Sequence, residues 1–320
     1  MAQATNTTTS AGLSPSMQAY YDRKMLEHAK TQFVFQQYGQ KRSIPKNNGK
    51  SVQFRRWNLF TPSTTGQKLT EGVTPDGQAL SMSAVTANVE QYGAYVEVSD
   101  LLDLTAIDPV ISDSVELLAE QLGNVVDLIT RDALAATTNV QFAGAANVAD
   151  NTVAAGDKLT VAEIRKAVRT LKKNKARTFT RQGGKPHYIC ICDPDSTFDL
   201  QNDGLWQDVS KYSNAEQIYS GEIGRLFGVV FVETTNATVL AGAGASSIDL
   251  HATYVFGADS YGVIDIAGSG AVKSIIKPHG SAGSADPLDQ RATVGAKVTA
   301  YTAKVLNDNW IIAVHHAVSA

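Results

Sequence analysis

The side chains that could carry out chemistry are scattered, and they do not form a recognisable catalytic or metal-binding motif. The two cysteines, Cys190 and Cys192, sit one residue apart in a short apolar run and lack the second pair that a zinc site needs. His315 and His316 are adjacent, so on a strand they face opposite sides. We therefore expect no disulfide and no metal at these positions, and a reducing compartment.

Two aspartates, Asp193 and Asp195, flank a proline where a helix is expected to begin. Their carboxylates could bind a hard cation, but Asp followed by Pro is a common helix start, and capping accounts for both. Residues 257–262 lack the spacing of a nucleophile elbow, and the glycines between 221 and 228 suit a helix end and a strand start. No Walker motif is present. The sequence thus predicts no catalytic residue, no cofactor and no metal, and a protein that is not an enzyme.

One charge cluster is dense, because residues 160–185 carry nine cations and a single acid, Glu163. The cations are Arg165, Lys166, Arg169, Lys172, Lys173, Lys175, Arg177, Arg181 and Lys185. They could contact nucleic-acid phosphates, or they could form a solvated helix face that meets acidic neighbours. We favour the second interpretation, since a single aromatic residue, Phe179, lies among the cations and no known nucleic-acid module accompanies them.

The composition is that of an ordinary core-forming protein. The chain has 320 residues, of which 43% are hydrophobic and 18% charged, with a net charge of −3. That length exceeds what one core usually needs, so we expect two linked subdomains. Residues 1–16 do not resemble a signal peptide and read as a flexible tail, and no apolar stretch is long enough to span a membrane.

A long ribbon is the clearest structural prediction. Strand-like runs at 51–60 and 81–98 are separated by a segment rich in Pro and Gly, and such a ribbon is barely stable alone in water. We expect it to lie on another copy of the chain, which would remove apolar residues from water: Phe54, Trp57, Leu59 and Phe60. The predicted inter-subunit contact residues are Arg55, Arg56, Trp57, Lys68, Glu71 and Asp76.

Two features flank this ribbon. Before it, residues 17–38 have helical spacing and 41–50 form a basic link, so we read residues 1–50 as an arm that docks onto neighbouring structure. In the returning strand, apolar residues change from odd to even positions at 91–93. A change of parity implies a β-bulge or a sharp twist, and we expect the ribbon to leave its parent sheet there.

A long helix is expected after Asp108, a preferred N-cap that Pro109 follows. Continued to Thr138, it is a rod of about 45 Å. Its apolar residues step by three or four: Ile111, Val115, Leu118, Leu122, Val125 and Ile129. Since the stripe is short and Gly123 interrupts it, we favour a helix packed across a sheet over a coiled coil.

The second half of the chain begins with a loop at 141–157, which we take as a subdomain boundary. Thr160 and Glu163 form a capping box that opens a helix. The next elements are a strand at 187–192, a helix from 193, a helix at 215–227 and a strand at 228–234, which together form a small α/β unit. The remaining pattern is mainly β, with strands at 254–266, 272–278, 292–306 and 310–318.

Several longer segments resemble a family of tailed-bacteriophage major capsid proteins. They are residues 41–50 (KRSIPKNNGK), 69–78 (LTEGVTPDGQ), 91–100 (QYGAYVEVSD), 103–109, 221–228 (GEIGRLFG), 231–235 (FVETT) and 279–295 (HGSAGSADPLDQRATVG). The resemblance runs from about residue 13 to 310. It implies the α+β fold of Hong Kong-type phage capsids, with an N-terminal arm, an extended loop, a peripheral domain with a long spine helix and an axial domain.

On this resemblance the domains are the arm (1–50), the extended loop with its strands (51–98), the peripheral domain (99–150, completed by 285–320) and an α/β axial domain (151–284). The implied function is a structural one, in which pentamers and hexamers close an icosahedral shell around double-stranded DNA. Its implied partners are copies of itself and, non-specifically, packaged DNA. Portal, scaffold and decoration proteins are further candidates, and a membrane is not. The implied location is the virion, after assembly in the host cytoplasm.

Two other classes of function remain open. A hydrolase-like enzyme could use the α/β unit, but it would need a nucleophile, a base and an orienting group that the sequence does not reveal. A DNA-binding protein could work through the cations of 160–185.

Overall fold

The computed structural model describes residues 34–45, 47, 49–58, 60–64, 66–74, 77–105, 109–144, 146–180, 186–206, 222–266, 273–281 and 286–319. Most of the predicted arm, including most of the helix expected at 17–38, lies outside these residues. The described chain begins at Val34 and forms a 3-10 turn, η1 (Phe35–Tyr38). None of its helices has the length and hydropathy needed to cross a bilayer.

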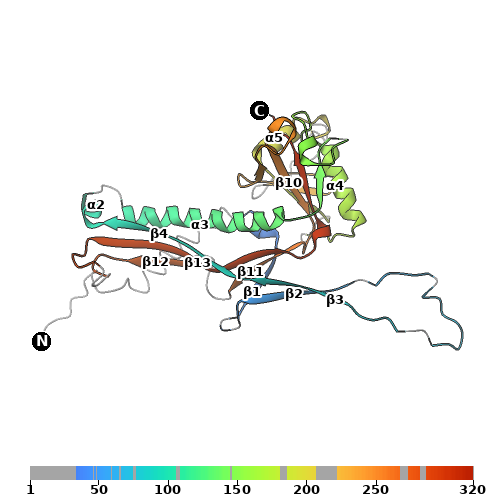
Figure 1. Cartoon of the computed structure of the whole chain (residues 1–320), viewed down its shortest axis with the longest axis horizontal. Coiled ribbons are helices and arrows are strands. Elements are labelled where there is room, and N and C mark those ends of the chain that lie inside the picture. Colours follow the sequence, from blue (N-terminus) through green and yellow to red (C-terminus); the bar gives the residue numbers. More distant parts are fainter. Residues whose placement is uncertain are drawn as a thin grey trace.

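A five-stranded sheet forms the elongated lower body of the molecule (Figure 1). Its centre is the long strand β13, which pairs antiparallel with β4 on one side and with β12 and β11 on the other, while β1 joins β11 in parallel. The strands are β1 (Gln40–Ile44), β4 (Glu90–Ser99), β11 (Tyr261–Ile266), β12 (Lys273–Lys277) and β13 (Arg291–Val305). The strands predicted at 272–278 and 292–306 are confirmed.

The long helix α3 (Val110–Ala135) lies along this sheet, as Figure 1 shows, and shares a core cluster with β13. The predicted spine helix across a sheet is therefore confirmed. Its apolar stripe is buried from Val115 through Leu122, but the next fully buried apolar side chain is that of Val126 rather than Val125. The reason is that a straight helix turns every 3.6 residues and drifts away from a strict heptad. The predicted cap at Asp108 lies outside the described residues.

The predicted ribbon consists of β2 (Ser51–Trp57) and β3 (Met82–Asn88), and it projects from the body in Figure 1. In the described part of the chain these two strands pair only with each other. The chain leaves the ribbon at Val89 and enters β4, whose register against β13 shifts between Val298 and Tyr301. The predicted irregularity and the departure of the ribbon from the sheet are confirmed, but the extra residue lies in β13 rather than in the returning strand, because Glu90–Tyr92 of β4 faces Val298–Tyr301 of β13.

A second, seven-stranded sheet with two helices stands above the first (Figure 1). Its strand order is β5-β14-β10-β6-β8-β7, with β9 paired to β10. Its elements are β5 (Val140–Phe142), α4 (Val161–Lys173), β6 (Tyr188–Cys192), α5 (Pro194–Gln201), β7 (Glu222–Leu226), β8 (Val229–Glu233), β9 (Thr238–Leu240), β10 (Leu250–Phe256) and β14 (Ile311–His316). The predicted cap of α4 is present, since the Thr160 side chain accepts the Glu163 N–H. Side chains of α4 and α5 pack together with Cys190 in one core cluster. Cys190 and Cys192 are both buried and free, as predicted.

Three predicted elements were wrong. The link predicted at 41–50 begins inside strand β1, which pairs with β11 of the five-stranded sheet. The described part of the helix predicted at 215–227 is the strand β7, which turns directly into β8 through Phe227 and Gly228. The prediction failed because the spacing of apolar residues there is compatible with a helix. In addition, the turn lacks the Asn-Gly pair that usually marks a two-residue hairpin. The strand predicted at 254–266 is two strands in different sheets, because the chain turns at Gly257 and at Asp259, whose φ is 58°.

The two sheets do not follow chain order. β14 belongs to the seven-stranded sheet although it lies near the C-terminus, whereas β11 and β12 belong to the five-stranded sheet. The predicted domain limits stay a prediction.

Candidate assembly surface and a buried polar cluster

The base of the ribbon is held by its own subunit. Phe54 of β2 and Ala87 of β3 are buried in a small cluster with Ile44 of β1 and Ile264 of β11. The close fit depends on Gly262 of β11, because a Cβ atom there would lie 2.6 Å from the Phe54 ring. The prediction that a neighbouring copy covers Phe54 was therefore wrong, since Phe54 completes the core of its own chain.

Beyond this base the ribbon is exposed. Its described large apolar side chains are Trp57 (60% exposed), Phe60, Leu69, Val73, Leu80 and Met82. Surfaces of this kind usually mark interaction sites, because contiguous apolar area left in water is costly. Leu59 lies outside the described residues.

The predicted contact residues lie along this surface but not in one cluster. Arg55 donates to Gln53 Oε1 at 3.2 Å, and the Arg56 guanidinium lies 5.9 Å from the centre of the Trp310 ring. Trp57 ends β2, and Lys68 and Glu71 are exposed on the long loop that follows. Asp76, the sixth predicted contact residue, is outside the described residues. Their role between subunits stays a prediction.

Sequence reasoning missed a second exposed apolar surface on the short helix α2 (Asp100–Thr105) at the end of β4. Leu101 is 68% exposed and Leu104 is 82% exposed, and Tyr95 of β4 is 69% exposed. The sequence signal was the presence of three leucines within six residues. In the structure this short helix has no buried residue, so the leucines form an exposed surface.

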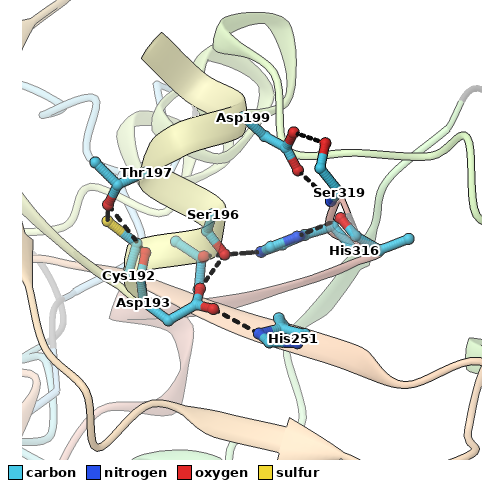
Figure 2. Close-up of polar contacts among 10 residues, drawn as sticks. Cys192, Asp193, Ser196, Thr197, Asp199, His251, His316 and Ser319 are labelled. Atoms are coloured by element: carbon cyan, nitrogen blue, oxygen red, sulfur yellow. Dashed lines mark hydrogen bonds and ion pairs between the residues drawn. The ribbon is translucent and has the colours of Figure 1, made fainter. Parts of the chain in front are cut away.

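A buried polar cluster lies where β6, β10 and β14 meet the start of α5, and Figure 2 shows its side chains pointing toward one another. Asp193 contacts His251 Nδ1 at 2.5 Å through one oxygen and accepts the Ser196 hydroxyl through the other. His316 Nε2 lies 2.9 Å from the Thr253 hydroxyl and 3.3 Å from that of Ser196. Because His316 Nδ1 donates to a backbone oxygen 3.0 Å away, Nε2 is the acceptor of the neutral ring.

Asp193 occupies the N-cap position of α5, as predicted, but the expected capping by its side chain was wrong. Pro194 is at the first helical position, as predicted, but the Asp193 side chain makes no cap hydrogen bond. Its carboxylate is used by His251 and Ser196 instead. The ligand atoms of Asp193, Asp195 and His251 lie within 4.8 Å of one another, yet the contact between Asp193 and His251 accounts for the geometry without a cation.

This cluster contains a serine, a histidine and an aspartate, but it lacks the arrangement of a catalytic triad. Ser196 and His316 are both fully buried, so no substrate can reach the hydroxyl. The aspartate orients His251 and the serine, not the histidine that faces the serine. The nucleophile, base and orienting group that a hydrolase would need are therefore absent from this cluster.

The electrostatics agree with a structural role. The hydrogen bond to Asp193 raises the pKa of His251. Burial favours a higher pKa for Asp193, but hydrogen bonds from His251 and Ser196 outweigh it and hold this pKa below its usual value. Burial lowers the pKa of His316 to about 4, so this ring is neutral near pH 7. The cluster joins α5 to the central strands of the sheet through groups that satisfy one another.

Comparisons with known proteins agree on one fold. The family model of phage capsid proteins matches residues 113–276, just over half of the chain. The chain is similar to the capsid of Ralstonia phage GP4, with 14% identity, a TM-score of 0.70 and 91% of each chain covered. It is similar to the capsid of cyanophage Pam1, with 14% identity, a TM-score of 0.67, and 99% of this chain and 97% of that chain covered. A search of curated proteins found no match.

Proposed function

The chain belongs to the phage capsid protein family, and we propose that its copies form pentamers and hexamers that close an icosahedral shell around double-stranded DNA. It is a structural protein of the virion, which points away from enzymatic activity. The observation that carries the proposal is the ribbon of β2 and β3, which leaves its own subunit and exposes apolar side chains along its length.

In the proposed mechanism, neighbouring copies bury each other's exposed apolar side chains. Each ribbon lies over an adjacent copy, so that Trp57, Leu69 and Val73 leave water at a neighbour's surface. Head-to-tail contacts of this kind close into rings when the rotation between copies allows it. Charged residues of mixed sign along the ribbon, among them Arg55 and Glu71, would set the register of the contact rather than its strength.

We assign the seven-stranded unit to the axial domain and α3 with the five-stranded sheet to the peripheral domain. Strand pairing supports placing β5 and β14 with the axial unit, and β11 and β12 with the peripheral one. We keep portal, scaffold and decoration proteins as candidate partners, and the host cytoplasm as the place of assembly.

The proposal is tested by removing the ribbon's loop. Deleting residues 61–78 leaves the base around Phe54 intact, so the subunit should stay folded and soluble but should not form shells. Negative-stain electron microscopy and sedimentation measure both properties. Shells of normal size from the deletion variant would refute the proposed role of the ribbon.

Matched point variants separate this role from a general effect on hydrophobicity. Leu69→Ser and Val73→Ser together should abolish shells, because both side chains are more than half exposed in the subunit. The control is Val148→Ser with Val239→Ser, which removes two exposed side chains outside the ribbon, one from the loop after β5 and one from β9 of the seven-stranded sheet. Equal loss of shells in both variants would contradict the proposal.

A further inference from the structure

The outer side of α4 carries four cations around an open hollow. Arg165, Arg169, Lys172 and Lys173 recur at helical spacing and are exposed, whereas Ile164 and Leu171 on the other side are buried. With Val168 and Phe227 they line a hollow of about 530 Å³. The helix thus gathers positive charge beside an aromatic ring that comes from the turn between β7 and β8.

The cations of this hollow are not neutralised by nearby acids. Within the described part of the chain none of the four forms an ion pair, although Lys166 pairs with Glu163 at 2.7 Å and Arg177 with Asp259 at 3.3 Å. Two acids of the same unit form hydrogen bonds elsewhere: Asp203 accepts the Val161 N–H at 2.9 Å, and Asp199 accepts the Ser319 N–H at 2.8 Å. The charge of α4 is therefore available to a partner.

The aromatic residue beside these cations is held in a costly conformation. Phe227 and Gly228 form a two-residue turn in which both φ angles are positive, 49° and 79°. Asn-Gly is the usual choice for such a turn, and a bulky side chain with positive φ is strained by about 1–3 kcal/mol. The ring is 47% exposed, and the Arg165 guanidinium lies 5.0 Å from its centre. A strained backbone that presents an exposed ring next to a cation indicates that the ring has a functional role.

The positive surface continues from the hollow toward the ribbon. At the end of α4, Asn174 donates to Asn309 O at 2.9 Å, which places Trp310 next to the helix. The guanidinium carbons of Arg177 and of Arg56 each lie 5.9 Å from the centre of the Trp310 ring. We call the combined surface the basic band: Arg165, Arg169, Lys172, Lys173, Phe227, Arg177, Trp310 and Arg56. Of its cations, Arg177 is already paired with Asp259. Aromatic rings that the sequence places far from the cations thus alternate with them in space.

We propose that the basic band binds the phosphodiester backbone of nucleic acid without reading its sequence. The inference rests on the proposed function, which places DNA inside the shell. A DNA duplex carries one negative charge about every 1.7 Å of its axis, and helix cations on successive turns can meet several phosphates. The rings of Phe227 and Trp310 hold the neighbouring guanidinium groups in place by cation–π contact. An acidic surface of a second copy is the competing partner, but a row of guanidinium groups fixed on aromatic rings suits a nucleic acid better.

The test measures binding of the unassembled, full-length protein to a short labelled DNA duplex of random sequence at several salt concentrations. Each phosphate contact adds about 0.9 to the slope of log K against log salt. The variant that carries Arg165→Gln, Arg169→Gln, Lys172→Gln and Lys173→Gln should therefore lose about 3 to 4 from this slope. The control changes the same charge on the other sheet, through Lys273→Gln, Lys277→Gln, Lys297→Gln and Lys304→Gln, and should lose less than about 1.

A second variant tests the ring. Phe227→Asn should raise the melting temperature, because Asn accepts a positive φ, and should weaken DNA binding about two- to fivefold, because Arg165 loses its aromatic support. A residue with a purely structural role would not give greater stability together with weaker binding. Unchanged DNA binding in this variant would contradict the use of the ring.

Shell formation is scored separately by electron microscopy, so that failure of this inference is distinguishable from failure of the proposed function. Equal slopes for the α4 variant and the lysine control would overturn the basic band as the DNA site. An α4 variant that binds DNA like the wild type but forms no shells would also overturn it, and would assign α4 to an acidic surface of a neighbouring copy. A wild-type protein that forms no shells would instead refute the proposed function, whatever its DNA affinity.

Discussion

The ring of Phe54 lies directly against the backbone of Gly262, so closely that a methyl group on Gly262 would approach ring atoms to 2.6 and 2.8 Å. This contact joins the base of the ribbon to β11 and thereby sets the direction in which the ribbon leaves the body.

Gly262→Ala should therefore destabilise the subunit by about 1–3 kcal/mol and impair shell formation, because overpacking displaces the ribbon base. Urea denaturation and electron microscopy measure the two effects. Gly156→Ala is the control, since nothing lies within 4 Å of a Cβ atom at that position. Adding Phe54→Leu to Gly262→Ala should recover part of the loss, and a double variant no better than the single one would contradict this explanation.

A second prediction concerns the attachment of the described N-terminal segment to α3. One oxygen of Asp127 accepts the backbone N–H groups of Val34 and Phe35 at 2.9 and 2.8 Å, and burial raises the pKa of this carboxyl despite these bonds. Asp127→Ala leaves two buried donors without an acceptor and should cost about 1–3 kcal/mol. Faster hydrogen exchange at Val34 and Phe35 is the expected signal.

The control for this prediction is Asp132→Ala on the same helix, where the side chain is exposed and pairs with Arg131. It should change stability by less than about 0.5 kcal/mol. Similar exchange rates in the two variants would show that Asp127 does not hold the segment.

The third prediction is a loss of stability in acid. Burial lowers the pKa of His316 to about 4, below its ordinary value of 6.5, so folding favours the neutral ring. Stability from this group is complete above about pH 6.5 and falls as the pH drops toward 4, by about 3 kcal/mol in total. Urea denaturation of unassembled subunits between pH 7 and 4 measures the loss, and His316→Gln should remove it. Parallel pH curves for wild type and variant would refute the assignment.

The titratable neighbours of His316 change the stability of the fold in other pH ranges. Asp193, whose pKa is lowered, adds stability that is lost only as the pH falls below about 3.8. His251, whose pKa is raised, adds stability that is complete below about pH 6.5 and is lost as the pH rises through its raised pKa. Asp199 also lies near His316 and favours its charged form. Between pH 6.5 and 4, the difference between wild type and His316→Gln therefore reports on His316.

Local patterns predicted elements that are long or strongly periodic. The apolar stripe of α3 and the change of parity before Tyr92 both follow from side-chain periodicity, which the backbone geometry dictates directly. The start of α5 at Pro194 follows from local chemistry in the same way.

What sequence alone could not supply is the pairing of distant residues. The capping role assigned to Asp193 failed because His251, far along the chain, competes for its carboxylate. Only Phe179 lies among the cations of residues 160–185 in the sequence, but on the surface Phe227 and Trp310 contact these cations from other elements. Phe54 was assigned to a neighbouring copy because nothing local reveals that Gly262 makes room for its ring.

The two-stranded ribbon of β2 and β3 has another consequence. Both of its edges carry backbone N–H and C=O groups that could pair with a strand of another chain. Free subunits accumulate before they assemble, and at that stage such edges invite fibril-like stacking. The outer half of β2 places Arg55 on one face of the ribbon and Arg56 on the other, and both are exposed. In a fibril-like stack, the same arginine of successive copies would lie in a row, and like charges in a row repel one another. Arg55 and Arg56 would therefore disfavour stacking of unassembled subunits through their ribbons.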